Sequence, residues 1–280
     1  MKKSVNYWSF PAGTSVEDGI RMAKRAGFAG VELSMDAVGL QGMNRENAAR
    51  EARRIAEGEG MALPSLASGL CWDDLLTSAV PERRQRARDN IRRQADMAAE
   101  MGAESCLVLA GAVGVDFLKD GAPLLPYDGA YDASLEAFAE LAPYAERAGV
   151  QLAIENVWSK FLLSPLEMRD FIDKIGSKAV GCYFDVGNVL LTGYPEQWIK
   201  ILGRRILKVH FKDYRREPGG FNCFVDLLSG DVDFLAVMRA FEAVGYDGWC
   251  AAEMIPNYRQ FTDQTIVHAS LAMDRIFAGE

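Results

Sequence analysis

Short apolar runs alternate with longer amphipathic stretches along the whole chain. The short runs are rich in apolar and β-branched residues and are bounded by polar or glycine-containing turns, a pattern typical of buried β-strands. They lie at residues 4–10, 29–34, 61–67, 104–111, 150–156, 179–186, 205–211 and 248–254. Segments with helical spacing of apolar positions lie between and after them, and most end on a glycine, the residue that commonly closes a helix. These lie at residues 15–27, 44–60, 81–102, 132–149, 164–176, 195–203, 232–245 and 263–279.

Strict alternation of eight strands with eight helices predicts a (β/α)8 TIM barrel. The length of 280 residues is close to the roughly 250 residues usual for this architecture. A doubly wound open sheet alternates in the same way. However, the sequence contains neither a G-x-G-x-x-G opening a helix nor a P-loop, which disfavours the nucleotide-binding members of that class. No linker or composition break divides the chain, so we expect a single TIM-barrel domain over residues 1–280.

Composition narrows the class of ligand. The formal net charge of −8 argues against binding to nucleic acid or to a membrane surface, because both are negatively charged. The five cysteines include no C-x-x-C pair, which indicates neither a disulfide framework nor a thiolate metal site and fits a reducing cytoplasm. The N-terminus is too polar for a signal peptide, and the longest apolar stretch, at 106–115, has about half the length that spans a bilayer. We therefore expect a cytoplasmic protein with a small-molecule substrate.

Each of the last four predicted strands ends on a polar side chain that follows an apolar run. These residues are Glu155 in "LAIEN", Asp185 in "CYFDV", His210 in "LKVHF" and Glu253 in "CAAEM". In a barrel such strand ends converge on one mouth, where three bare carboxylates would repel one another. Two glutamates, an aspartate and an imidazole suit a divalent cation such as Mn, Mg, Co or Zn. Singly, each carboxylate could cap a helix or pair with a base, but four equivalent positions favour a metal site.

Three other charged or titratable residues receive a structural interpretation. His268, the second of two histidines, lies within a predicted helix without an acidic partner at ligand spacing. If the strand at 205–211 alternates with His210 facing inward, Lys208 also points into the barrel, and we expect the same of Glu32. An unpaired buried ion is costly, so each should meet an opposite charge, the other being one candidate.

The late motifs resemble those of the sugar phosphate isomerase/epimerase superfamily, which comprises xylose isomerase-like TIM barrels. The resemblance is closest to the ketose and pentulose-5-phosphate 3-epimerases. It rests on "AIEN" at 153–156, "YFDVGN" at 183–188, "VHFKD" at 209–213, "GDVDF" at 230–234 and "AAEM" at 251–254. The first half of the chain matches more loosely, through "GVEL" at 30–33 and "LVLAG" at 107–111.

The resemblance implies a metal-dependent 3-epimerase of a ketose or ketose phosphate. In this chemistry a 2-ketose chelates the cation through its carbonyl and a neighbouring hydroxyl, which acidifies C3 and stabilises a cis-enediolate. Glu155 and Glu253 are then both metal ligands and the catalytic acid/base pair, one on each face of C3. Asp185 and His210 only hold the metal, for which manganese is one candidate.

The resemblance also suggests substrate-binding residues. Arg216 lies where related epimerases place a substrate-binding arginine, although a solvated loop charge is an equal alternative. Asn188 stands where ketose epimerases often carry histidine and the pentulose-phosphate branch shows "GN". Trp158 and Trp72 could line the sugar-binding site or could be packing residues. Lys212 of "VHFKD" is a further candidate for substrate contact. Whether the substrate carries a phosphate stays open.

Other activities remain as alternatives. A related sugar isomerase or an inosose-type dehydratase could use the same enediolate. An endonuclease with a trinuclear zinc site would need many more than two histidines. A catalytically silent sugar-binding barrel would not need two opposed glutamates. The expected partner is a small sugar or sugar phosphate, and a homo-oligomer is compatible with the sequence.

Overall fold

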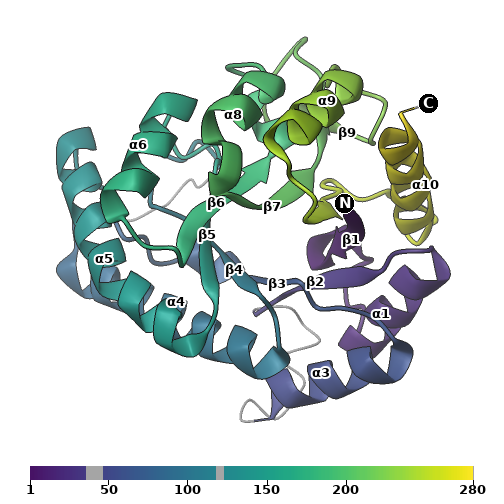
Figure 1. Cartoon of the computed structure of the whole chain (residues 1–280), viewed down its shortest axis with the longest axis horizontal. Helices are drawn as coiled ribbons and strands as arrows, with labels where there is room; N and C mark the ends of the chain where they lie inside the picture. The colour runs from purple at the N-terminus through teal and green to yellow at the C-terminus, as the bar shows by residue number, and fades with distance from the viewer. Residues whose placement is uncertain (36–46, 118–122, 280) are drawn as a thin grey trace.

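Eight parallel strands close into a barrel in the computed structural model, which describes residues 1–35, 47–117 and 123–279 (Figure 1). The strands are β1 (Lys2–Asn6), β2 (Gly30–Ser34), β3 (Ser65–Ala67), β4 (Ser105–Val108), β5 (Gln151–Glu155), β6 (Val180–Asp185), β7 (Ile206–Phe211) and β10 (Trp249–Ala252). They follow one another around the barrel in chain order, and β1 pairs with both β2 and β10, which closes the sheet. The predicted (β/α)8 barrel is confirmed.

Helices surround the barrel and pack on its outer face (Figure 1). They are α1 (Val16–Arg25), α3 (Ala48–Glu59), α4 (Pro81–Met101), α5 (Tyr127–Ala148), α6 (Pro165–Ile175), α8 (Pro195–Leu202), α9 (Phe234–Val244) and α10 (Gln264–Ala278). Left-handed glycines close six of them, as expected: Gly60, Gly102, Gly149, Gly176, Gly245 and Gly279. None of the helices in the described ranges is long and apolar enough to cross a membrane.

Several predicted boundaries differ from the structure. The strands expected over 61–67 and 104–111 are shorter, at Ser65–Ala67 and Ser105–Val108. The first strand ends at Asn6 rather than at residue 10, because the Asn6 side chain accepts a hydrogen bond from the Trp8 backbone and begins a 3₁₀ turn. The helix expected over 132–149 starts at Tyr127, directly after Pro126, and includes Gly129. Glycine is a poor helix former, so it weakens the helical pattern there. Residues 44–46, in the helix expected over 44–60, lie outside the described residues.

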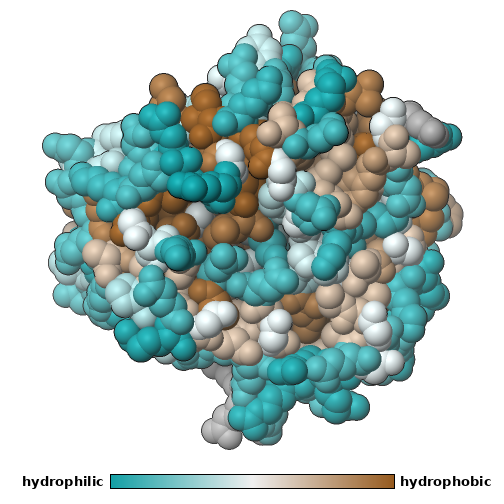
Figure 2. Space-filling model, in the orientation of Figure 1, coloured by the Kyte–Doolittle hydropathy of each residue, from teal (hydrophilic) through white to brown (hydrophobic). Residues whose placement is uncertain are grey.

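Two hydrophobic clusters contain residues of the barrel strands, and a third lies at the β8–β9 hairpin (residues 213–225). The larger cluster fills the space between barrel and helices and includes residues of every barrel strand, for example Val5, Ile154 and Phe211. The smaller cluster contains Ala67, Leu107, Ala153 and Tyr183 from four consecutive strands. Hydrophilic residues cover most of the rim of the molecule in the view of Figure 2, with apolar patches between them.

The two inward charges find partners, but they do not pair with each other. Lys208 is almost fully buried and forms an ion pair with Glu104, which precedes β4 at the amino end of the barrel. Glu32 pairs with the His210 ring instead. Lys208 lies two residues before His210, about 7 Å deeper in the barrel at a rise of about 3.3 Å per residue. The strand register therefore separates the two charges.

Short elements at the carboxyl ends of the strands were not predicted. They are the one-turn helix α7 (Val186–Val189) and the hairpin of β8 (Asp213–Tyr214) and β9 (Phe224–Val225). The Asp213 carboxylate holds this hairpin by accepting hydrogen bonds from the backbone of Tyr214, Gly230 and Val232. Both elements lie beside the barrel mouth and position residues of the candidate site.

Candidate active site

Four polar side chains converge at the barrel mouth. Glu155 and Asp185 end β5 and β6, His210 lies in β7, and Glu253 directly follows β10. The register places Asp185 opposite His210 across the β6–β7 pair. One donor atom from each of the four residues lies within 4.8 Å of all the others. The structure thus brings together the whole set that the sequence suggested.

The geometry of these donor atoms fits a divalent cation. Within the described part of the chain, Nδ1 of His210 and Oδ2 of Asp185 are buried without a hydrogen-bond partner, which is rare for polar atoms. Nδ1 lies 3.6 Å from Oε1 of Glu155, 3.7 Å from Oε2 of Glu253 and 4.0 Å from Oδ2 of Asp185. Two ligands about 2.1 Å from a tetrahedral ion lie about 3.4 Å apart. The arrangement resembles a ligand cage rather than a hydrogen-bond network.

The electrostatics of the cluster lead to the same interpretation. Burial raises the pKa of Asp185 to about 7, against the opposing effect of Lys212. Burial also raises the pKa of Glu155, and the nearby Glu253 adds to that shift. For Glu253 burial acts in the same direction, but the positive charges of Lys212 and His210 outweigh it and lower the pKa. A divalent cation is the kind of group that would let all three carboxylates ionise together.

Lys212 is the buried cation of the site. Its ammonium donates to Oε2 of Glu253 at 2.6 Å and lies 3.8 Å from Oδ2 of Asp185. It also lies 4.4 Å from the centre of the Phe224 ring. Lys212 lines the same cavity as Glu155 and Glu253, so the structure places this predicted substrate contact at the site, and its role in binding substrate stays a prediction.

Two asparagines hold the carboxylates in place. The backbone N–H of Asn188 donates to Oδ1 of Asp185 at 2.8 Å, and its side chain donates to Oε1 of Glu155 at 3.4 Å. Asn156 brackets the Asp185 backbone, donating to its carbonyl at 2.8 Å and accepting from its N–H at 2.9 Å. Asn156 was not among the predicted site residues, although it is the last residue of the "AIEN" motif.

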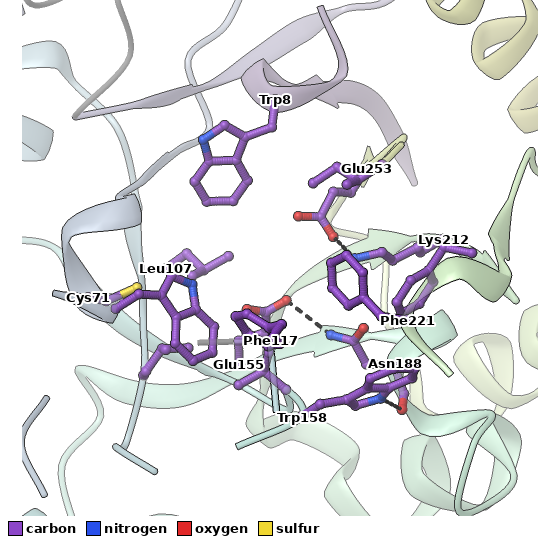
Figure 3. Close-up of a pocket in the computed structure, with 15 residues that line it drawn as sticks. Trp8, Cys71, Leu107, Phe117, Glu155, Trp158, Asn188, Lys212, Phe221 and Glu253 are labelled. Atoms are coloured by element: carbon purple, nitrogen blue, oxygen red, sulfur yellow. Dashed lines mark hydrogen bonds and ion pairs between the residues drawn. The ribbon is translucent and has the colours of Figure 1, made fainter. Parts of the chain in front are cut away.

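Two of the four donor residues, Glu155 and Glu253, line a cavity of about 210 Å³ (Figure 3). Glu155 and Glu253 direct their carboxylates into it, with Lys212 and Asn188 beside them. Its walls are aromatic and come from separate loops: Trp8, Trp72, Phe117, Trp158, Phe221 and Phe224. Among these, only the two tryptophans after the third and fifth strands were candidates from the sequence.

The aromatic rings of the wall contact one another. Trp72 and Phe117 have ring centres 5.0 Å apart, and Phe117 and Phe221 have ring centres 5.4 Å apart. Trp158 packs on Phe224 at 5.0 Å, and its indole N–H donates to the backbone carbonyl of Asn188 at 2.9 Å. The rings join loops that follow β3, β4, β5 and β8, and they give the cavity an apolar wall around its polar floor.

Arg216 lies apart from the cavity that the described residues line. Its exposed guanidinium donates to the backbone carbonyl of Leu190 at 3.2 Å and lies 5.2 Å from the Tyr194 ring. The structure therefore does not bring it to the four donors, and its role in substrate binding stays a prediction. His268 lies on α10, where Nδ1 contacts the Tyr258 hydroxyl at 3.0 Å.

Gly187 packs so closely against Lys212 that a larger side chain at this position should destabilise the fold. An ideal Cβ at this position in α7 would lie 2.9 Å from both the Cβ and the carbonyl oxygen of Lys212. We expect Gly187→Ala to lower the free energy of unfolding by about 1–3 kcal/mol, as overpacking does, measured by urea denaturation. The control is Gly58→Ala, at an exposed position of α3 where a Cβ meets nothing within 4 Å. It should raise stability by roughly 0.5–1 kcal/mol. Equal stability of Gly187→Ala and the wild type would contradict the close packing.

Comparison with known proteins identifies a family that has this fold. A family model described as a xylose isomerase-like TIM barrel matches residues 20–272. An uncharacterized protein of Methanocaldococcus jannaschii, MJ1311, is 25% identical over 128 residues, which span 44% of this chain and 43% of that protein. The chain thus matches less than half the length of this relative.

Two solved sugar epimerases have a similar structure. D-psicose 3-epimerase from Clostridium cellulolyticum H10, crystallised with D-tagatose, has a TM-score of 0.80 and 17% identity, with 99% of each chain covered. The 3-keto-D-glucoside 4-epimerase of E. coli has a TM-score of 0.79 and 18% identity, also with 99% of each chain covered. At these identities the likeness shows a shared fold.

Proposed function

The chain belongs to the xylose isomerase-like TIM barrel family, and we propose that it is a divalent-metal-dependent 3-epimerase of a ketose or ketose phosphate. One observation carries the proposal. Glu155 and Glu253 reach a single cavity from β5 and from the end of β10, strands that are not neighbours. They form one cluster with Oδ2 of Asp185 and Nδ1 of His210, two buried atoms that have no hydrogen-bond partner among the described residues. The similar fold of two solved sugar epimerases supports the proposal.

The residues of the site have distinct proposed roles. One of the two glutamates removes the proton from C3 on one face, and the other returns a proton on the opposite face of the cis-enediolate, which inverts the carbon. A bound divalent cation would supply positive charge where the substrate oxygens become negative. Asp185 and His210 would hold that cation. Lys212 keeps Glu253 ionised, and Asn188 restrains Glu155.

The substrate is proposed to be a small sugar, either free or phosphorylated. Asn188 matches the "GN" that the pentulose-phosphate 3-epimerases show at this position, which favours a phosphorylated substrate. Of the lining residues that the structure describes, Lys212 is the one cation, and Glu253 already engages it. The two forms of substrate are therefore both included in the test. Assembly into a homo-oligomer, location in the cytoplasm and a single domain over 1–280 stay predictions.

The proposal is tested by proton exchange at C3. The protein is incubated with Mn²⁺ in deuterated water and a panel of ketoses, their phosphates and 3-keto-glucosides, and the products are examined by NMR. We expect deuterium at C3 of at least one ketose together with its epimer. Conversion to an aldose would instead indicate an isomerase, and loss of water a dehydratase. Absence of exchange with every compound, in protein shown to contain metal, would contradict the proposal.

A further inference from the structure

Glu32 of β2 is fully buried inside the barrel and accepts hydrogen bonds through both of its oxygens. Oε1 accepts from Nδ2 of Asn6 at 2.6 Å and lies 2.7 Å from Nε2 of His210. Oε2 accepts from the hydroxyl of Tyr183 at 2.6 Å and from the hydroxyl of Ser65. A carboxylate oxygen accepts about two hydrogen bonds. Each carboxylate oxygen of Glu32 thus contacts two groups that can donate a hydrogen bond, as an ionised carboxylate requires.

This arrangement determines which nitrogen of His210 carries the proton when the ring is neutral, as it is in a metal ligand. Because Oε1 of Glu32 accepts, Nε2 of His210 must donate to it. The neutral ring then has its lone pair on Nδ1, the nitrogen that lies 3.6–4.0 Å from oxygens of the three site carboxylates. A histidine that binds a metal commonly donates its other N–H to a carboxylate, which fixes the tautomer and the ring orientation.

We propose that Glu32 is a positioning residue of the metal site, which presents Nδ1 of His210 to the cation. The inference rests on the metal site of the proposed function. The Tyr183 ring adds to the positioning, since its centre lies 4.4 Å from that of the His210 ring. A purely structural Glu–His pair gives no reason for Nδ1 to be buried without a hydrogen-bond partner among the described residues. A cation site explains both why Nε2 donates to Glu32 and why Nδ1 has no hydrogen-bond partner among the described residues.

Metal affinity tests the role of Glu32 without relying on turnover. Glu32→Gln has a similar volume, but its amide directs an NH₂ group at neighbouring donors. We expect the dissociation constant for Mn²⁺, measured by calorimetry, to rise by about 10–100-fold, the usual effect of losing such a partner. Tyr183→Phe is the control, because it removes a donor to Oε2 and leaves the contact between Glu32 and His210. Its affinity should stay much closer to that of the wild type than the affinity of Glu32→Gln.

A double-mutant cycle with His210→Ala separates positioning from a general effect of charge or folding. If Glu32 acts through His210, adding Glu32→Gln to His210→Ala should change metal affinity by no more than about twofold. The same large loss in both backgrounds would overturn the proposal. So would wild-type affinity in a folded Glu32→Gln protein.

The wild-type protein offers a second test that needs no folded variant at Glu32. His210 and His268 are its two histidines, so ring ¹⁵N labelling gives two sets of imidazole signals, and His268→Ala assigns them. In the Zn²⁺-loaded protein we expect His210 to carry its proton on Nε2. A proton on Nδ1, or failure to bind any divalent cation, would overturn the inference. If the tautomer and the cycle are as expected but no sugar is turned over, the epimerase proposal fails while this inference holds.

Discussion

Dialysis against excess EDTA is expected to abolish turnover of whichever ketose the panel identifies, and added divalent cation is expected to restore it. The reaction places negative charge on the substrate oxygens, and loss of even one group that stabilises such charge costs about 10²–10³ in rate. Lys212 cannot substitute, because its ammonium is held by Glu253 at 2.6 Å. Turnover and bound metal are measured on the same samples, before dialysis, after dialysis and after each of Mn²⁺, Mg²⁺, Co²⁺ and Zn²⁺ is added.

The control for this experiment is the fold of the dialysed protein. The strand ladder is held by backbone hydrogen bonds, and the core between barrel and helices contains none of the four donor side chains. Circular dichroism of the dialysed protein should therefore match that of the starting material, so that a loss of turnover is not caused by unfolding. Full activity in excess EDTA after prolonged dialysis, with no metal detected, would refute metal dependence.

The barrel and the four donors could be predicted from sequence because both follow from local patterns. An apolar run that ends on one polar side chain indicates a strand and also the residue at its carboxyl end. In a barrel those ends meet at one mouth, so Asp185 and His210 become neighbours without any knowledge of packing. The structure brings these residues together as expected.

Features that depend on contacts between distant segments could not be predicted in this way. Strands β8 and β9 have two residues each, too few to show a period, and the hairpin depends on the three backbone groups that Asp213 binds. The aromatic wall combines rings such as Phe117 and Phe221, from loops far apart in sequence. The contact between Glu32 and His210 could not be predicted either. The two residues are 178 positions apart, and their contact depends on how the barrel strands are aligned with one another.

Replacement of either catalytic candidate, Glu155→Gln or Glu253→Gln, is expected to lower the turnover rate by about 10²–10⁴. Glutamine keeps an oxygen ligand and a similar volume, but it removes the group that accepts and returns the C3 proton. Asp185→Asn should behave differently, because Asp185 is proposed only to hold the cation. Its metal affinity should fall, and its activity should recover in part at high metal concentration. Turnover of all three variants is measured against metal concentration.

Deuterium exchange then assigns the two glutamates. With one epimer as substrate, the variant that lacks the abstracting base should incorporate no deuterium at C3. The variant that lacks only the returning acid can still exchange at C3 without inverting it. Glu57→Gln is the control, since Glu57 pairs with Arg53 on the exposed face of α3, and it should retain wild-type turnover. Near-wild-type turnover in both site variants, with metal bound, would exclude the two-carboxylate mechanism and leave a dehydratase or a sugar-binding protein as the alternatives.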